Sequence, residues 1–270
     1  MQIKKENIKD ISENELDYTI WRYLTFSKFI SLLTYGSLWF PKLNILQDQF
    51  EGNLPTPARE SLEASHQKWK TKFPPNLHNQ FDEMAKRNVE DGRELTVVNC
   101  WFLDESESPE MWDDYVQNNE GVAIRSTVRK LATHVFTEPQ FSSIGKVRYV
   151  DFASHDMTIY HASQASERAF LKRDCLKHEQ EVRIVTLNFK TPACVDMNGI
   201  PYTQEQIAGK NMNNFENAGL YIRVNLEKLI DSIVIAPQAP GWFELLIKRI
   251  MGLSQLNIEI KRSELEPQNE

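Results

Sequence analysis

Glycine is scarce in this chain of 270 residues, which has ten glycines where an average protein has roughly 7%. Long apolar runs are also missing, since no stretch approaches the roughly 18 residues of a membrane span. The three cysteines are odd in number and widely spaced. These shortages argue against many tight glycine turns, a membrane partner and a disulfide framework. We expect a cytoplasmic protein with free thiols at Cys100, Cys175 and Cys194.

Local catalytic motifs are missing as well. The chain has no Gly-x-x-x-x-Gly-Lys loop, no Gly-x-Gly-x-x-Gly turn and no Gly-x-Ser-x-Gly elbow. Its six histidines form no His-x-x-x-His pair and lie near no pair of cysteines, so we expect no metal site. Any site must therefore be assembled from residues dispersed along the chain.

The composition that remains is that of an ordinary globular protein, with 41% apolar and 26% charged residues. The net charge of −7 does not attract polyphosphate over the whole surface, so nucleic-acid binding would need a local basic patch. One candidate is the stretch 167–177, but its acidic residues favour a solvated helix face. No repeat or linker interrupts the chain, and we expect one domain over 1–270.

Strand and helix signals alternate along the chain. A β-branched and aromatic strand is predicted at 18–23, then a helix from Phe26 closed by Gly36, then a strand at 37–40 stopped by Pro41. The polar stretch 55–92 predicts two helices broken at Pro74 and Pro75, as an insertion or lid. Ser108-Pro109-Glu110 predicts the start of a helix that ends near Gly121.

The remaining signals complete an α+β chain. A long helix is predicted over 158–177 and another over 241–251. Further strands are predicted at 96–102, 122–124, 146–151, 182–189, 220–224, 232–236 and 257–261.

Three groups of residues are candidates for function. Arg22 lies between Trp21 and Tyr23 in a strand, where it either reaches solvent or holds an anion at a cleft. Trp112 and Tyr115 share a helical face, which indicates core packing or a wall that stacks on a flat ring.

The third group is the pattern Glu179-x-Glu181-x-Arg183. Strand alternation puts these three side chains on one face. Two carboxylates so placed repel each other unless a cation or a ligand hydroxyl lies between them. A surface ladder of ion pairs around Arg183 is one explanation, and a functional site is the other.

Together these motifs resemble an uncharacterised bacterial domain family. That family has a Tyr-Arg-Tyr opening, an Asn-Asp-Pro-Phe-Glu loop, a Met-Trp-x-x-Tyr helix and a Glu-x-Glu-x-Arg strand. The matching stretches occur in the same order, with Trp21 in place of Tyr. Gln47 and Gln49 stand in place of Asn and Pro, so the turn of the family's loop is not implied for this one. The matching stretches are 21–23, 47–52, 111–115 and 179–183.

More distantly, the layout resembles the ADP-ribosyltransferase fold of bacterial toxins and defence effectors, which implies a split β core with flanking helices. In that fold nicotinamide adenine dinucleotide (NAD) binds without a glycine-rich loop. The resemblance implies that Glu181 is the catalytic acid and that Glu179 orients or deprotonates the acceptor. It implies cofactor-binding roles for Arg22, Tyr23, Trp39, Phe40, Asp48, Trp112, Tyr115 and Arg183.

The function implied is transfer of ADP-ribose from NAD to a nucleic acid or protein, as a toxin of a toxin–antitoxin pair or an anti-phage effector. A developing ribosyl cation would be stabilised by a nearby carboxylate. The alternative is a non-catalytic module of the same fold that binds a nucleotide or nucleic acid. A third interpretation is an interaction partner whose Glu-x-Glu is only a surface ladder. An antitoxin protein is a further implied partner.

Overall fold

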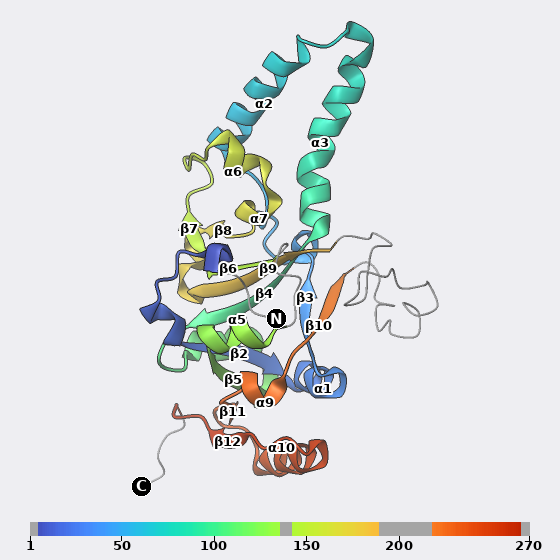
Figure 1. The fold of residues 1–270 in the computed structure, drawn as a ribbon. Coiled ribbons are helices and arrows are strands. Elements are labelled where there is room, and N and C mark those ends of the chain that lie inside the picture. Colours follow the sequence, from blue (N-terminus) through green and yellow to red (C-terminus); the bar gives the residue numbers. More distant parts are fainter. Residues whose placement is uncertain (1–4, 136–141, 189–217, 266–270) are drawn as a thin grey trace, which may run out of the picture.

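The structure, a computed structural model, describes residues 5–135, 142–188 and 218–265. It has mixed α and β structure built around one large mixed sheet, with helices flanking it (Figure 1). The neighbouring strands of this sheet are, in order, β1 (Ile8–Lys9), β6 (Ser142–Lys146), β9 (Glu181–Leu187), β4 (Thr96–Leu103), β2 (Thr19–Thr25), β5 (Gly121–Thr127), β11 (Ser232–Ile235) and β12 (Glu259–Arg262).

Pairing in this sheet is parallel at its two edges, β1 with β6 and β11 with β12, and antiparallel everywhere between. Two small sheets lie beside it: antiparallel β3 (Ser37–Pro41) with β10 (Gly219–Arg223), and parallel β7 (Arg148–Val150) with β8 (Leu171–Arg173). The helices are α1 (Phe26–Tyr35), α2 (Thr56–Lys70), α3 (His78–Leu95), α4 (Pro109–Tyr115), α5 (Val128–His134), α6 (Ile159–Ser163), α7 (Ala165–Arg168), α9 (Leu226–Leu229) and α10 (Gly241–Ser254).

Most local signals of the sequence are confirmed. Helix α1 begins after Thr25, whose hydroxyl accepts a hydrogen bond from Lys28, and ends at Gly36, which has the left-handed φ of 55° that glycine adopts freely. Helix α4 begins at Pro109 under a Ser108 cap, as predicted, but it ends at Tyr115 rather than near Gly121.

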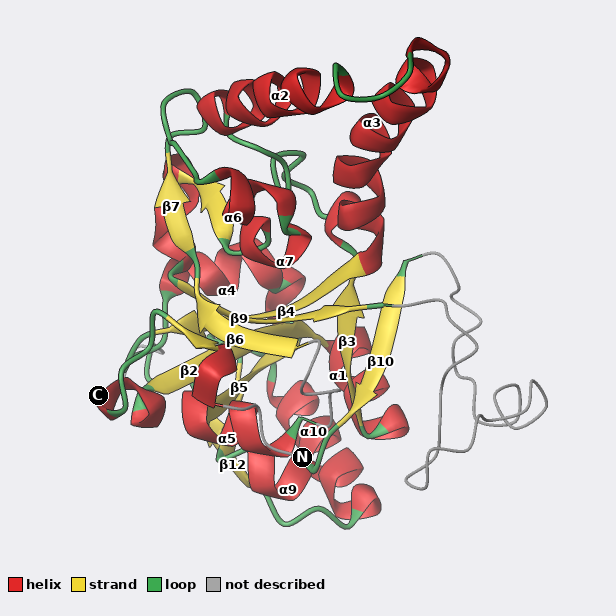
Figure 2. Ribbon diagram, turned by 45° about the horizontal axis from the view of Figure 1, so that its top comes forward, coloured by secondary structure: helices red, strands yellow, loops and turns green. Residues whose placement is uncertain are grey.

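The predicted break at the two central prolines is also confirmed. Helix α2 ends at Lys70 and α3 begins at His78, with both prolines in the connection. The two helices form a hairpin that stands away from the body of the molecule (Figure 2). Between this hairpin and the large sheet lie α6, α7 and the β7–β8 pair (Figure 1).

The predicted helix over 158–177 is wrong. Thr158 does cap a helix, α6, but Gln164 has extended backbone angles and ends it after one turn. Two buried cations explain the change, because Arg168 and Lys172 are 1% and 6% exposed and must meet buried acceptors rather than line a solvated face. The chain therefore continues as α7, β8 and a 3₁₀ helix, η7 (Asp174–Glu179).

The predicted strand over 146–151 is two strands. It breaks at Val147, whose backbone N–H donates to the carbonyl of Glu181 at 2.8 Å, so the chain leaves β6 for β7.

The main apolar core lies on the large sheet beneath α1, α4, α5 and α10, and it includes Phe29, Trp101 and Phe243. Two smaller apolar clusters lie towards the hairpin. One joins the base of α2 to α6 through Ala58 and Ala162, and the other packs Phe170 against the sheet. Charged side chains are buried between these smaller clusters and the sheet, and they form the site described next.

Candidate functional site

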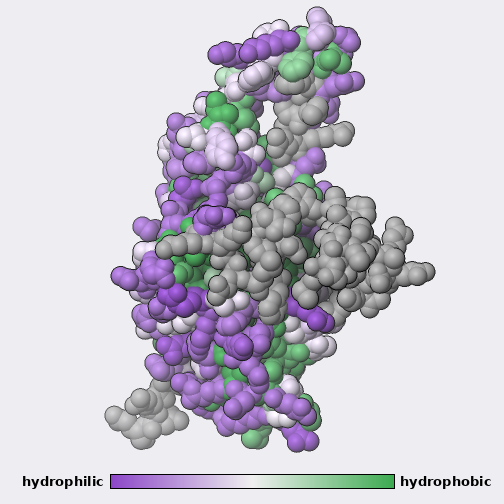
Figure 3. All heavy atoms as spheres, viewed as in Figure 1, coloured by the Kyte–Doolittle hydropathy of each residue, from purple (hydrophilic) through white to green (hydrophobic). Residues whose placement is uncertain are grey.

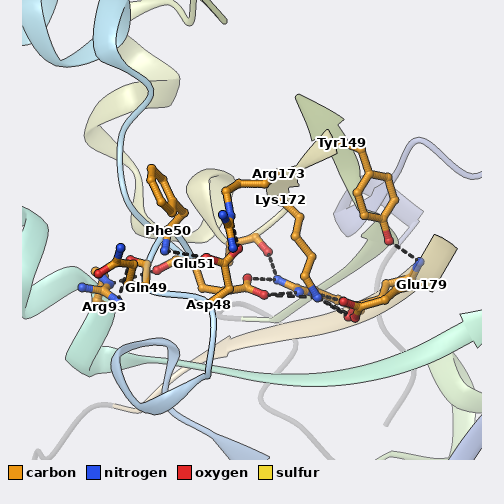
Figure 4. A network of polar contacts seen from close by, with 12 residues as sticks. Asp48, Gln49, Phe50, Glu51, Arg93, Tyr149, Lys172, Arg173 and Glu179 are labelled. Atoms are coloured by element: carbon orange, nitrogen blue, oxygen red, sulfur yellow. Dashed lines mark hydrogen bonds and ion pairs between the residues drawn. The ribbon is translucent and has the colours of Figure 1, made fainter. Parts of the chain in front are cut away.

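Five charged side chains are buried together where β8 and the 47–52 loop meet strand β9 (Figure 4). We call them the buried charge cluster, and each is 7% exposed or less. They come from four separate segments of the chain. The members are Glu51, Lys172, Glu179, Glu181 and Arg183.

Local backbone geometry places the carboxylates side by side. Glu181 and Arg183 alternate onto one face of β9, as the sequence predicts. The strand alternation predicted for Glu179 is wrong, because this residue ends η7 and β9 begins only at Glu181. Gln180 between them adopts a left-handed φ of 36°. This tight turn brings Glu179 beside Glu181, so that both carboxylates contact the ammonium of Lys172.

The cations bridge all three carboxylates. Arg183 donates to both oxygens of Glu51 at 2.7 and 2.9 Å, and its Nε donates to Glu181. Lys172 Nζ lies 2.6 Å from Glu179 Oε2, 2.9 Å from Glu181 Oε1 and 3.4 Å from Glu51 Oε1. The interpretation of Glu179, Glu181 and Arg183 as a surface ladder is therefore wrong, because the network is buried.

Charge counting shows why one carboxylate differs from the others. Three carboxylates share two cations, so the fully ionised cluster would carry a buried charge of −1. Burial raises the pKa of Glu179, and its hydrogen bond with Glu181 and the negative charge of Glu181 raise it further. Burial also opposes ionisation of Glu181, but Arg183 and Lys172 outweigh it and hold the pKa of Glu181 well below its ordinary value. Glu179, with its pKa raised to about 7, is therefore the carboxylate of the pair that takes up a proton first as the pH falls.

Two tyrosines border the carboxylate pair. The hydroxyl of Tyr115 donates to Glu179 Oε2 at 3.4 Å, and the Tyr115 side chain is 36% exposed. Burial raises the pKa of Tyr115, and the charge of Glu179 adds to the effect. The hydroxyl of Tyr149 accepts from the backbone N–H of Glu181 at 2.9 Å. The side chain of Tyr115 thus lies between Glu179, which is buried, and the solvent.

Arg22 lies near the cluster without joining it. Trp21 pairs with Phe102, and Phe102 pairs with Glu181, so their side chains share a face and Arg22 begins on the opposite one. The guanidinium donates to the carbonyl of Cys100 at 2.6 Å. Burial lowers the pKa of Arg22, whereas the charges of Cys100, Tyr115 and Glu181 raise it. The guanidinium of Arg22 therefore interacts with Glu181 through its charge, whereas its hydrogen bond is to the carbonyl of Cys100.

Asp48 lies at the entrance to the 47–52 loop and connects it to β8. One carboxylate oxygen accepts from the backbone N–H of Phe50 at 3.0 Å, and the other lies 3.1 Å from Nε of Arg173. The Arg173 guanidinium is 4.9 Å from the centre of the Phe50 ring. Asp48 therefore orients the loop that carries Glu51 into the cluster.

The other predicted cofactor residues lie elsewhere. Tyr23 and Trp112 are buried and meet edge to face at 4.9 Å, and Phe40 is fully buried. Trp39 is half-buried and packs on Tyr221 with ring centres 4.8 Å apart. None of the three buried rings offers a face to a ligand. Of the residues predicted from the sequence, those that the structure groups in or around one site are Arg22, Asp48, Tyr115, Glu179, Glu181 and Arg183.

Sequence reasoning missed Glu51, Lys172 and Tyr149. Glu51 stood within the quoted 47–52 loop, where a buried role was signalled only by the resemblance. Lys172 stood in the stretch read as a solvated helix face. Tyr149 had no signal, since its role depends on the parallel pairing of β7 with β8.

Two of the open clefts in the described part of the chain are lined by neither Arg22 nor a cluster carboxylate. One of about 670 Å³ is lined by Phe50, Leu54, Thr56, Arg59, Val150, Asp151, Phe152, Ala153, Arg173, Asp174 and Cys175. The other, of about 310 Å³, is lined by Phe102, Asp104, Glu107, Ser108, Pro109, Glu110, His178 and Gln180.

Metal ligation finds no support in residues 5–135, 142–188 and 218–265, where no three His, Cys, Asp or Glu side chains are arranged to hold an ion. Of the thiols, Cys100 and Cys175 are free, and Cys194 lies outside the described residues. None of the described helices combines the length and the apolar character that crossing a membrane requires.

Comparisons of this chain with protein-family models, with curated proteins and with solved structures find no match.

Proposed function

We propose that the chain is an NAD-dependent ADP-ribosyltransferase that modifies a nucleic acid or a protein, in the manner of a toxin or an anti-phage effector. The observation that carries the proposal is the buried carboxylate pair of Glu179 and Glu181, which meets on the ammonium of Lys172 beneath the partly exposed Tyr115. A carboxyl group whose pKa is raised towards neutrality suits general acid–base work. We propose further that the large mixed sheet and its flanking helices form a split β core of the ADP-ribosyltransferase type.

The proposal gives the two carboxylates different roles. The resemblance implied that Glu181 is the catalytic acid, but the charge of Glu181 is matched by both Lys172 and Arg183. We therefore assign Glu179 to the substrate and give Glu181 the role of holding the cations in place. In the reaction the bond between ribose C1′ and nicotinamide breaks, with its electron pair leaving on nicotinamide. An acceptor nucleophile then bonds to C1′ and yields its proton to Glu179, which a pKa of about 7 leaves partly ionised near neutral pH.

Arg22 fits the role of an anion-binding residue. Its described hydrogen bond uses one guanidinium nitrogen, and the side chain is partly exposed. Lys28 at the start of α1 lies close enough that the charge of Arg22 adds to burial in lowering the pKa of Lys28. Two cations that repel each other are stabilised when an anion lies between them. The pyrophosphate of NAD would supply that anion.

The test uses NAD labelled on its adenylate phosphate, mixed with the purified protein, DNA, RNA and cell extract in separate reactions. We expect label to pass to one macromolecular fraction, and Arg22→Ala to bind NAD at least about tenfold more weakly. Arg125→Ala is a matched control, because Arg125 lies beside Trp21 on β5, on the other face of the sheet from the Arg22 side chain. A wild-type protein that neither binds NAD nor transfers label would exclude the proposal.

A specific observation also favours the second candidate, a non-catalytic module that binds a nucleotide or nucleic acid. The cleft of about 670 Å³ is lined by Phe50, Arg59 and Arg173 but by no cluster carboxylate, whereas a transferase needs its carboxylate at the ligand. The same assay separates the two functions. Wild-type protein that binds NAD or nucleic acid without cleaving the dinucleotide would be a binding module.

A further inference from the structure

The hairpin formed by α2 and α3 carries an exposed surface at the end farthest from the buried charge cluster (Figure 1). Helix α2 has 15 residues, so the end of this helix lies about 22 Å along its axis from its start. We call residues 66–78 the hairpin tip. Figure 3 shows apolar side chains at this end of the molecule among strongly hydrophilic ones. Trp69, Phe73 and Leu77 are 54%, 39% and 37% exposed.

The charge of this region is opposite to that of the whole chain. Residues 64–81 include three lysines and no aspartate or glutamate, whereas the chain as a whole carries −7. Lys70 is engaged in structure, because it pairs with Asp82 of α3 at 2.5 Å. Lys72 Nζ lies 4.1 Å from the centre of the Trp69 ring. Lys68 has no ion pair within the described parts of the chain.

Hydrogen bonds give the hairpin tip a defined shape. Asp82 also accepts from His66 of α2 at 3.2 Å, which fastens the two helices together. The Thr71 hydroxyl donates to the Lys68 carbonyl at 2.8 Å, and Lys72 N–H donates to the Trp69 carbonyl at 2.9 Å. In this hydrogen-bonded turn the Lys72 ammonium lies over the indole of Trp69, while the Lys70 ammonium pairs with Asp82.

We propose that the hairpin tip binds single-stranded nucleic acid. Lys72 lies over one face of the Trp69 indole, and Trp69 is 54% exposed, so we expect a base to stack on the opposite face of the ring. Lys68 and Trp69 lie in the last turn of α2, and Lys72 and Phe73 follow in the turn after this helix, with Lys72 over the Trp69 ring. Stacking of bases on aromatic rings with lysines along the phosphates is the usual mode of single-strand binding.

Other occupants fit the hairpin tip less well. Electrostatic attachment to anionic membranes uses clusters of about 4–8 basic residues, and here one of three lysines is already paired. Duplex nucleic acid hides its bases, so it would leave the exposed indole face unused. The inference goes beyond the site at β9, and it holds whether or not that site transfers ADP-ribose.

The experiment measures binding of a fluorescein-labelled oligothymidine or oligouridine of roughly 12 nucleotides by anisotropy. We expect Trp69→Ala to weaken binding at least about fivefold, which is the lower range for the loss of one stacked base. Trp242→Ala is the matched control, because Trp242 on α10 is also 54% exposed but has Glu244 two residues away. It should leave the affinity unchanged within about twofold.

A second variant tests the lysines. In the double variant Lys68→Ala with Lys72→Ala, the slope of log affinity against log salt should fall by about 1.4, at roughly 0.7 per phosphate contact. Circular dichroism confirms that each variant is folded. The proposal is overturned if Trp69→Ala binds as wild type, if duplex of equal length binds as tightly, or if the protein binds vesicles of phosphatidylserine and phosphatidylcholine but no oligonucleotide.

Discussion

Arg183 donates hydrogen bonds to both carboxylate oxygens of Glu51, 132 positions away in the chain, at 2.7 and 2.9 Å. This forked pair joins the 47–52 loop to the centre of the large sheet, and both side chains are 2% exposed or less. An arginine suits the place because its planar guanidinium can also donate to Glu181 and to the carbonyl of Ala169. The buried charge cluster therefore depends on this one side chain.

Removal of Arg183 should destabilise the fold strongly. In Arg183→Ala, Glu51 and Glu181 would be left buried with Lys172 as their only cluster cation, and breaking a buried ion pair typically costs about 3–5 kcal/mol. The free energy of unfolding, measured with a chemical denaturant, should fall by that amount.

The control is an arginine with a similar forked pair at the surface. Arg129 contacts Asp17 at 2.7 and 3.0 Å, but both side chains are exposed. Arg129→Ala should change the unfolding free energy by less than about 1 kcal/mol. Equal losses in the two variants would mean that burial does not set the strength of the Arg183 pair.

The local predictions succeeded where a few neighbouring residues decide the outcome. The Ser108 cap, the left-handed Gly36 and the two prolines of the hairpin each act within one turn of the chain, so the sequence contains their signal. Alternation on β9 likewise placed Glu181 and Arg183 on one face correctly.

The predictions failed where burial depends on distant segments. Lys172 stands in a stretch with several charged residues and was read as part of a solvated helix face, yet β8 places it among three buried carboxylates. The same burial turned the predicted helix over 158–177 into two short helices and a strand. The ion-pair partners of Lys172 and its burial are set by segments distant in the sequence, so the residues next to Lys172 do not reveal them.

The proton on Glu179 predicts a specific dependence of stability on pH. The environment raises the pKa of Glu179 from 4.5 to about 7, chiefly through burial and the neighbouring Glu181. Between these values the folded chain keeps a proton that the unfolded chain has lost, so this residue makes stability fall as pH rises through that window. In Glu179→Gln, which cannot ionise, this fall should disappear.

The measurement is the melting temperature of wild type and Glu179→Gln between about pH 5 and about pH 8. Glu259→Gln is a control, because Glu259 is exposed on β12 and has no place in the cluster. It should keep the wild-type profile. A Glu179→Gln profile that also follows wild type would show that Glu179 is not the protonated member of the pair.

Trp112 should behave as a core residue. Its ring is 4% exposed and meets Tyr23 edge to face, while Nε1 donates to Glu107 at 2.9 Å. Trp112→Ala should lower the unfolding free energy by about 3–5 kcal/mol. Trp112→Phe keeps most of the ring and should cost about 1 kcal/mol, chiefly for the lost hydrogen bond.

Binding of NAD to the folded Trp112→Phe variant separates a packing role from a ligand role. Because the ring faces the core, we expect the affinity for the dinucleotide to equal that of wild type. A clear weakening in a variant with near-normal stability would return Trp112 to the ligand wall that the sequence suggested.

The two carboxylates of the pair should respond differently to the loss of their charge. Glu179→Gln removes a group that meets only Lys172, Tyr115 and Glu181, and the proposed reaction needs its ionised form. We expect the variant to stay folded and to lose about 10²–10³ in the rate of ADP-ribose transfer, as when one electrostatic contact to a transition state is removed. Glu181→Gln weakens the contacts of Arg183 and Lys172, so its main effect should be a loss of about 3–5 kcal/mol in stability. The measurements are transfer of labelled ADP-ribose below the melting temperature of each variant and denaturant unfolding of both. If folded Glu181→Gln lost transfer while Glu179→Gln kept it, the catalytic role would belong to Glu181, as the resemblance implied.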